Sequence, residues 1–104
     1  MIDTPHHIRT VEPEELRDLL EENDEVVVID VRPAGEFALD SLEGSFNIPT
    51  YNFHIQLAEI PKETIIVTVC DFGGHRSWGA VETLKDLGFT RAVALKGGKA
   101  AWKN

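Results

Sequence analysis

The chain has 104 residues, a length that fits one domain with a single modest core. Its 18 acidic and 10 basic residues give a net charge of -8, which argues against a surface for nucleic acid or an anionic membrane, because both require a basic footprint. The one cysteine, Cys70, excludes an intrachain disulfide and a zinc site built on cysteine pairs.

The N-terminal half begins with helical periodicity in the segment 13–22. Pro13 suits a first helical position, the two glutamates after it suit the positive end of a helix dipole, and leucines form an apolar face. The next run, 26–31, is apolar on both faces, which predicts a buried parallel strand. We then expect a short helix over 33–39, a short strand over 44–49 and a helical segment over 51–60.

The C-terminal half continues the alternation of strands and helices. The run 64–69 predicts a second long buried strand at the centre of the sheet. A helix over 76–87 should follow, and Gly88 suits a left-handed residue at its end. We expect a last strand over 92–95 and a terminal helical piece after Gly97-Gly98. The alternation predicts an α/β protein with a parallel sheet.

The segment 70–76, between the central strand and the next helix, carries the chemistry. In open parallel sheets, sites form beyond the carboxyl ends of the strands. The helix that follows points N–H groups back at the loop, and Gly73 and Gly74 permit positive φ angles that turn loop amides toward an anion. This setting favours the thiolate of Cys70 over the thiol. Arg76 adds a forked cation for the oxygens of an anion.

Four more residues of this segment are candidates for lining the site. They are Asp71, Phe72, His75 and Ser77. His75 is a candidate substrate contact or proton donor, and simple exposure to solvent is the alternative. A carboxylate at Asp71 opposes ionisation of the neighbouring thiol unless it points away.

Two charged residues after the first long strand are candidate supporting residues. In one interpretation, Asp30 accepts hydrogen bonds from the loop and orients it. In the other, which we favour, the charges hold loops together through ion pairs, for instance between Arg32 and Glu36.

Several short motifs occur in a fixed order along the chain. They are Ile29-Asp30-Val31-Arg32-Pro33, Gly44-Ser45-Phe46-Asn47-Ile48-Pro49, Val67-Thr68-Val69-Cys70, Gly74-His75-Arg76-Ser77 and Leu95-Lys96-Gly97-Gly98 with Ala101-Trp102. In this order and spacing, nearly the whole chain resembles the rhodanese-like domain family. The resemblance implies one three-layer α/β domain over residues 1–104, a central parallel sheet with helices on both sides. It also implies transfer of a sulfane sulfur from thiosulfate or a related donor through a persulfide on Cys70, with no cofactor.

One departure from the family pattern leaves other functions open. Five residues lie between Cys70 and Arg76, whereas many sulfurtransferases of the family have four. The longer spacing is similar to that of Cdc25-type phosphatases and related arsenate reductases, in which a larger ring can seat a tetrahedral oxyanion over the thiolate. A non-catalytic binding module is a third hypothesis, and the retained cysteine and arginine argue against it.

The expected partners follow from charge and from the resemblance. They are a small sulfur-containing anion as donor and a thiol, cyanide or a protein as sulfur acceptor, with no nucleic acid and no membrane. The longest aliphatic run, Val26 to Ile29, is far too short to cross a bilayer. The N-terminal residues lack the basic and apolar regions of a signal peptide, so we expect a reduced, cytoplasmic setting.

Overall fold

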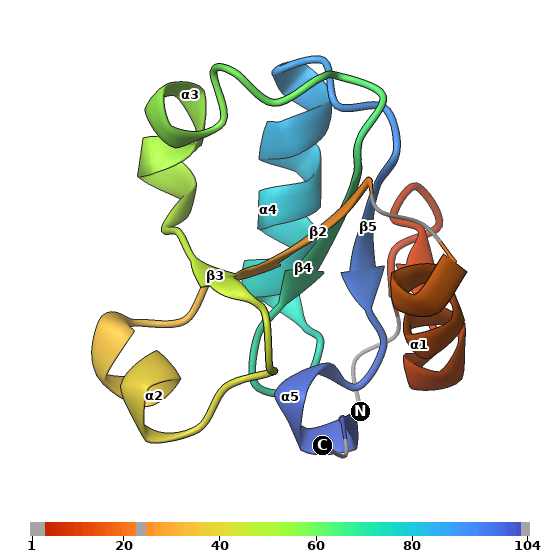
Figure 1. Ribbon diagram of the computed structural model, residues 1–104, viewed down its shortest axis with the longest axis vertical. Helices are drawn as coiled ribbons and strands as arrows, with labels where there is room; N and C mark the ends of the chain where they lie inside the picture. Colours follow the sequence, from red (N-terminus) through yellow and green to blue (C-terminus); the bar gives the residue numbers. More distant parts are fainter. Residues whose placement is uncertain (1–3, 23–24, 103–104) are drawn as a thin grey trace.

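One parallel sheet of five strands organises the molecule. The structure is a computed structural model and describes residues 4–22 and 25–102. The strands lie in the order β1-β5-β4-β2-β3 (Figure 1), and every neighbouring pair is parallel. Their bounds are β1 Thr10–Val11, β2 Val26–Asp30, β3 Phe46–Asn47, β4 Ile65–Val69 and β5 Ala92–Leu95. The expected α/β class is confirmed, and β4 is the central strand as predicted.

The helices alternate with these strands along the chain. They are α1 Pro13–Glu22, α2 Ala34–Leu39, the 3₁₀ turn η1 Thr50–Asn52, α3 Phe53–Gln56, α4 His75–Asp86 and α5 Gly98–Ala101. The bounds of α1 match the prediction, and α4 begins one residue before the predicted start. The segment 51–60, predicted to be helical, forms only η1 and the single turn of α3 before it enters turns.

Two apolar layers cover the two faces of the sheet. On one face, α3 and α4 contribute Phe53, Val81 and Leu84, all with 0% exposure. On the other face, α1 contributes Leu16, and Trp102 packs into the same layer just after α5. Figure 1 shows α3 and α4 on the opposite side of the sheet from α1, so the expected three-layer arrangement is confirmed.

Strand β4 shows why the sequence specifies this burial. All five of its residues are buried, and their side chains alternate between the two layers. Ile66 packs into the α3–α4 layer, whereas Val67 and Val69 pack into the α1 layer. A strand covered on both faces favours apolar residues on both, and β-branched side chains suit the pleated surface; the polar hydroxyl of Thr68 is hydrogen-bonded to Ser77.

The edge strand β1 was not predicted. It pairs with β5 through Thr10 opposite Ala94 and Val11 opposite Leu95. Two residues leave no periodicity to detect, so the pairing arises from tertiary structure alone. Among the helices in residues 4–22 and 25–102, none has the length and apolar character needed to span a membrane.

Candidate active site

The segment 70–74, hereafter the Cys70 loop, joins the carboxyl end of β4 to the start of α4. Cys70 directly follows the buried Val69 and is 3% exposed. A hollow of about 230 Å³ opens in front of it, lined by Cys70, Asp71, Phe72, Gly74, His75 and Arg76. The structure therefore brings most of the predicted site residues to one depression at the end of the sheet where α2 and α5 lie (Figure 1).

The turn that begins α5 holds the Cys70 loop from behind. The backbone N–H of Lys99 donates to the carbonyl of Cys70 at 2.8 Å, and that of Ala100 donates to the carbonyl of Asp71 at 2.9 Å. Two glycines allow this approach: a Cβ on Gly98 (φ +60°) would lie 2.5 Å from the nitrogen of Gly73, and one on Gly73 (φ +72°) would meet backbone 2.7 Å away. This contact was not predicted from the sequence, although the adjacent glycines at 97–98 are a signal for close backbone approach.

The backbone amides of the Cys70 loop and of the start of α4 have no acceptor in the described part of the chain, and that of Gly73 is packed against Gly98. Gly74 is the N-cap of α4, and the first hydrogen bond of the helix runs from the N–H of Trp78 to the carbonyl of Gly74 at 3.0 Å. Within the described residues, the backbone N–H groups of residues 71–76 show no protein acceptor. The positive φ expected at Gly73 is observed, but Gly74 has a φ of −106°, so only one of the two glycines uses the left-handed region.

Arg76 lies at the mouth of the hollow between two carboxylates. Its Nη2 is 2.7 Å from Oδ2 of Asp71, and its Nη1 is 3.8 Å from Oε2 of Glu36. The guanidinium is 45% exposed, so it contacts solvent as well. The Asp71 carboxylate thus points at Arg76, whose positive charge it partly neutralises.

A buried ion pair supports the loop from the side of β2. Arg32 donates through Nε and Nη2 to the Asp30 carboxylate at 2.9–3.1 Å, and both side chains are buried. Hydrogen bonding to Asp30 raises the pKa of Arg32 above its ordinary value. Arg32 also donates to the backbone carbonyl of Asp40 and lies 3.5 Å from Asp71. Arg32 therefore pairs with Asp30 and not with Glu36, which pairs with Arg76 instead.

Three other predicted residues differ in their placement. The Ser77 hydroxyl is buried, lies 2.7 Å from the Thr68 hydroxyl and donates to the Thr68 carbonyl at 3.0 Å, so it does not line the hollow. His75 is exposed and its ring meets that of Trp78 edge-on at 5.2 Å. Phe72, 78% exposed, stands at the rim of the hollow.

A second, larger hollow adjoins the first and was not predicted. Its volume is about 630 Å³, and it shares Arg76 with the hollow at Cys70. The remaining lining residues come from the segment after β2 and from the end of β3 and the residues that follow it: Val31, Arg32, Pro33, Ala34, Asn47, Pro49, Thr50 and Tyr51. Because three separate segments build it, no local sequence pattern marks it.

Comparison with known proteins gives one consistent family. The model of the Rhodanese-like domain family matches residues 12–104. A protein of Allochromatium vinosum named Sulfurtransferase is 30% identical over 95 residues, which cover 91% of this chain and 88% of that protein. A Mycobacterium tuberculosis protein named Probable adenylyltransferase/sulfurtransferase MoeZ is 37% identical over 95 residues, but the match covers only 24% of its length.

Solved structures show the same fold. A rhodanese-like domain protein from Staphylococcus aureus superposes with a TM-score of 0.78 at 32% identity, covering 93% of each chain. The human single-domain sulfurtransferase TSTD1 superposes with a TM-score of 0.76 at 28% identity, covering 89% of this chain and 93% of that one.

Proposed function

Because this chain belongs to the rhodanese-like domain family, we propose that it is a sulfurtransferase that carries sulfane sulfur as a persulfide on Cys70. The observation that supports this most directly is the surroundings of Cys70. The residue lies at the carboxyl end of the central strand, at the base of a hollow bordered by loop amides that have no other acceptor among the described residues. Such amides and a helix N-terminus stabilise a thiolate and a bound anion.

The proposed first half-reaction uses thiosulfate or a related donor. The Cys70 thiolate attacks the outer sulfur of thiosulfate, a bond forms between Sγ and that sulfur, and the S–S bond of thiosulfate breaks. Sulfite leaves with the bonding electron pair, so the charge on both sides is conserved. The amides of the Cys70 loop would stabilise the anionic oxygens as the bond breaks, and Arg76 would add positive charge once it turns from Asp71.

The second half-reaction returns the cysteine to its starting state. A thiolate, cyanide or a cysteine of an acceptor protein attacks the outer sulfur of the persulfide, and Cys70 leaves as a thiolate. Acceptors of the protein class fit the adenylyltransferase/sulfurtransferase relatives, in which this domain is about a quarter of the whole chain.

Phosphatase or arsenate reductase chemistry has weaker support. The relatives and structures reported above are named sulfurtransferases or rhodanese-like proteins.

The decisive experiment is intact-protein mass measurement after treatment with thiosulfate. We expect the wild type to gain the mass of one sulfur atom and to lose it when cyanide is added, with formation of thiocyanate. Cys70→Ser should neither gain the sulfur nor form thiocyanate, because the chain has no other thiol. Thiocyanate formation by Cys70→Ser at the wild-type rate would contradict the proposal.

A further inference from the structure

We propose that Asp71 and Glu36 determine donor specificity at Cys70, selecting an organic hydropersulfide (R–S–SH) over the dianion thiosulfate. The inference rests on the proposed sulfurtransferase function and deepens it by naming the donor class. Two independent observations carry it: the charge balance around the Cys70 loop, and the apolar hollow that adjoins the loop at Arg76.

The cations near the Cys70 loop are already paired. Arg76 binds Asp71 and Glu36, Arg32 binds Asp30, and Lys99 binds Asp40 at 3.0 Å. These ion pairs contain four carboxylates and three cations, counting the buried pair of Asp30 and Arg32, so they leave no excess positive charge around the loop. A doubly charged donor must either displace Asp71 from Arg76 or bind close to its carboxylate, and both are unfavourable.

The larger hollow supplies what an organic donor needs. Its walls include the apolar side chains of Val31, Pro33, Ala34, Pro49 and Tyr51. Because Arg76 lines both hollows, we place the sulfane sulfur of the donor at Cys70 and its carbon portion beyond Arg76, in the larger hollow. Burying apolar surface there favours binding, and thiosulfate has no carbon with which to use it.

The transfer step balances without a further reactant. The Cys70 thiolate attacks the outer sulfur of R–S–SH, the new Sγ–S bond forms, and the S–S bond of the donor breaks. The products are the Cys70 persulfide, which keeps the proton of the donor, and the thiolate RS⁻, which takes the bonding electrons. The reacting end carries less negative charge than thiosulfate, so Asp71 and Glu36 oppose its approach less.

The test measures the initial rate at which Cys70 gains one sulfur, by quenched intact-protein mass measurement at low ionic strength. The two donors are thiosulfate and benzyl hydropersulfide, at equal concentrations. The quantity compared is the ratio of the thiosulfate rate to the hydropersulfide rate. We expect this ratio to rise in Asp71→Asn and Glu36→Gln, by roughly threefold to tenfold in the more sensitive of the two variants. Added salt should raise the same ratio in the wild type, because it screens the repulsion.

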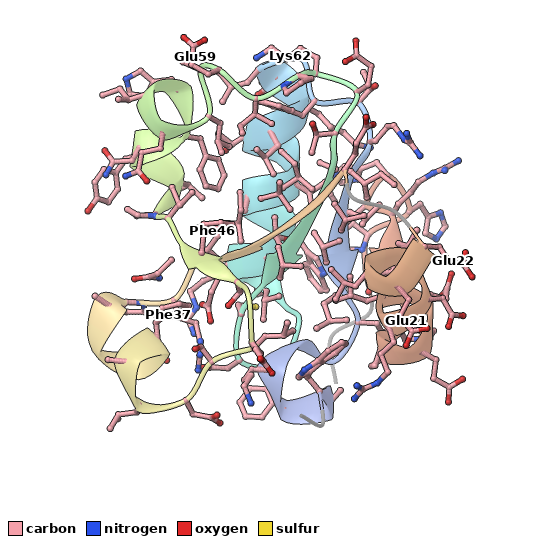
Figure 2. All side chains as sticks on the ribbon, viewed as in Figure 1. Glu21, Glu22, Phe37, Phe46, Glu59 and Lys62 are labelled. Carbon is pink, nitrogen blue, oxygen red and sulfur yellow. The ribbon has the colours of Figure 1, made fainter. Side chains whose placement is uncertain are left out.

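Glu59→Gln is the matched control. It removes the same charge from an exposed residue at the end of the molecule opposite α2 and α5 (Figure 2), so it should leave the ratio at the wild-type value. Tyr51→Ala tests the second observation. Tyr51 is 75% exposed, so its loss should not unfold the protein, and it should slow loading by benzyl hydropersulfide more than loading by thiosulfate.

The outcomes separate this inference from the proposed function. Absence of sulfur on Cys70 with both donors would contradict the sulfurtransferase assignment itself. If Cys70 is loaded but the ratio stays constant in Asp71→Asn and Glu36→Gln, or shifts equally in Glu59→Gln, then the donor inference is overturned. Glu36 is on the surface of α2, so its variant gives a result even where Asp71→Asn disturbs the loop.

Discussion

Replacing Gly98 by alanine tests whether backbone contact with the C-terminal turn holds the Cys70 loop in place. A Cβ at this position would lie 2.5 Å from the nitrogen of Gly73 and 2.8 Å from the carbonyl carbon of Asp71, so rigid backbone must move. The φ of +60° adds a left-handed conformation that costs an alanine about 1–2 kcal/mol. With about 1–3 kcal/mol for overpacking, the free energy of unfolding should fall by about 2–5 kcal/mol.

The assay combines thermal unfolding with sulfur loading of Cys70. At about 4–8 °C per kcal/mol for a domain of this size, the midpoint should fall by at least about 8 °C, and loading should slow because the loop carbonyls lose their donors. Gly35→Ala is the control: Gly35 lies within α2 and its added Cβ meets nothing within 4 Å, so stability should stay equal or rise by about 0.5–1 kcal/mol. A Gly98→Ala protein with wild-type stability and wild-type loading would refute the reasoning.

Two further predictions concern stability. Arg32→Leu leaves the fully buried Asp30 carboxylate without its partner, so urea unfolding should show a free energy of unfolding lower by about 3–5 kcal/mol. Lys99→Leu is the comparison: its partner Asp40 is 68% exposed, so the free energy of unfolding should fall by less than about 1 kcal/mol. Equal losses in the two variants would contradict the assigned burial. Phe53→Ala empties a fully buried position at the start of α3 and should lower the free energy of unfolding by about 3–5 kcal/mol. Phe72→Ala, at an exposed position, should change it by no more than about 0.5 kcal/mol.

The layers of the fold could be predicted because the residues at helix ends and the pattern of apolar residues indicate the same helices and strands. The helix α1 has a proline at its start, acidic residues in its first turn and a buried Leu16, and its observed bounds are those predicted, although Leu20 is 40% exposed. Strand β4 is apolar at every position except Thr68, whose hydroxyl is bonded to Ser77 in α4, and this pattern marks a strand with cover on both faces. Segments such as 51–60 carry apolar residues at helical spacing yet form mostly turns, because Phe53 and Leu57 can be buried with only one turn of helix between them.

The chemistry of the site could be predicted only in part. Cys70, the positive φ of Gly73 and the helix after the loop follow from the order of strand, loop and helix. The sequence did not reveal that Asp71 turns toward Arg76, because a side-chain direction depends on partners brought in by folding. Nor did it reveal that Glu36 reaches Arg76 from α2, forty positions earlier in the chain.

The contact between the Cys70 loop and the start of α5 also bears on how the protein is made. The donors to the carbonyls of Cys70 and Asp71 are Lys99 and Ala100, which the ribosome adds nearly thirty peptide bonds after the cysteine. A nascent polypeptide can therefore pair β2 with β4 before the start of α5 is present to hold the Cys70 loop. We therefore expect Cys70 to accept sulfur only after the segment 98–101 has docked against its loop.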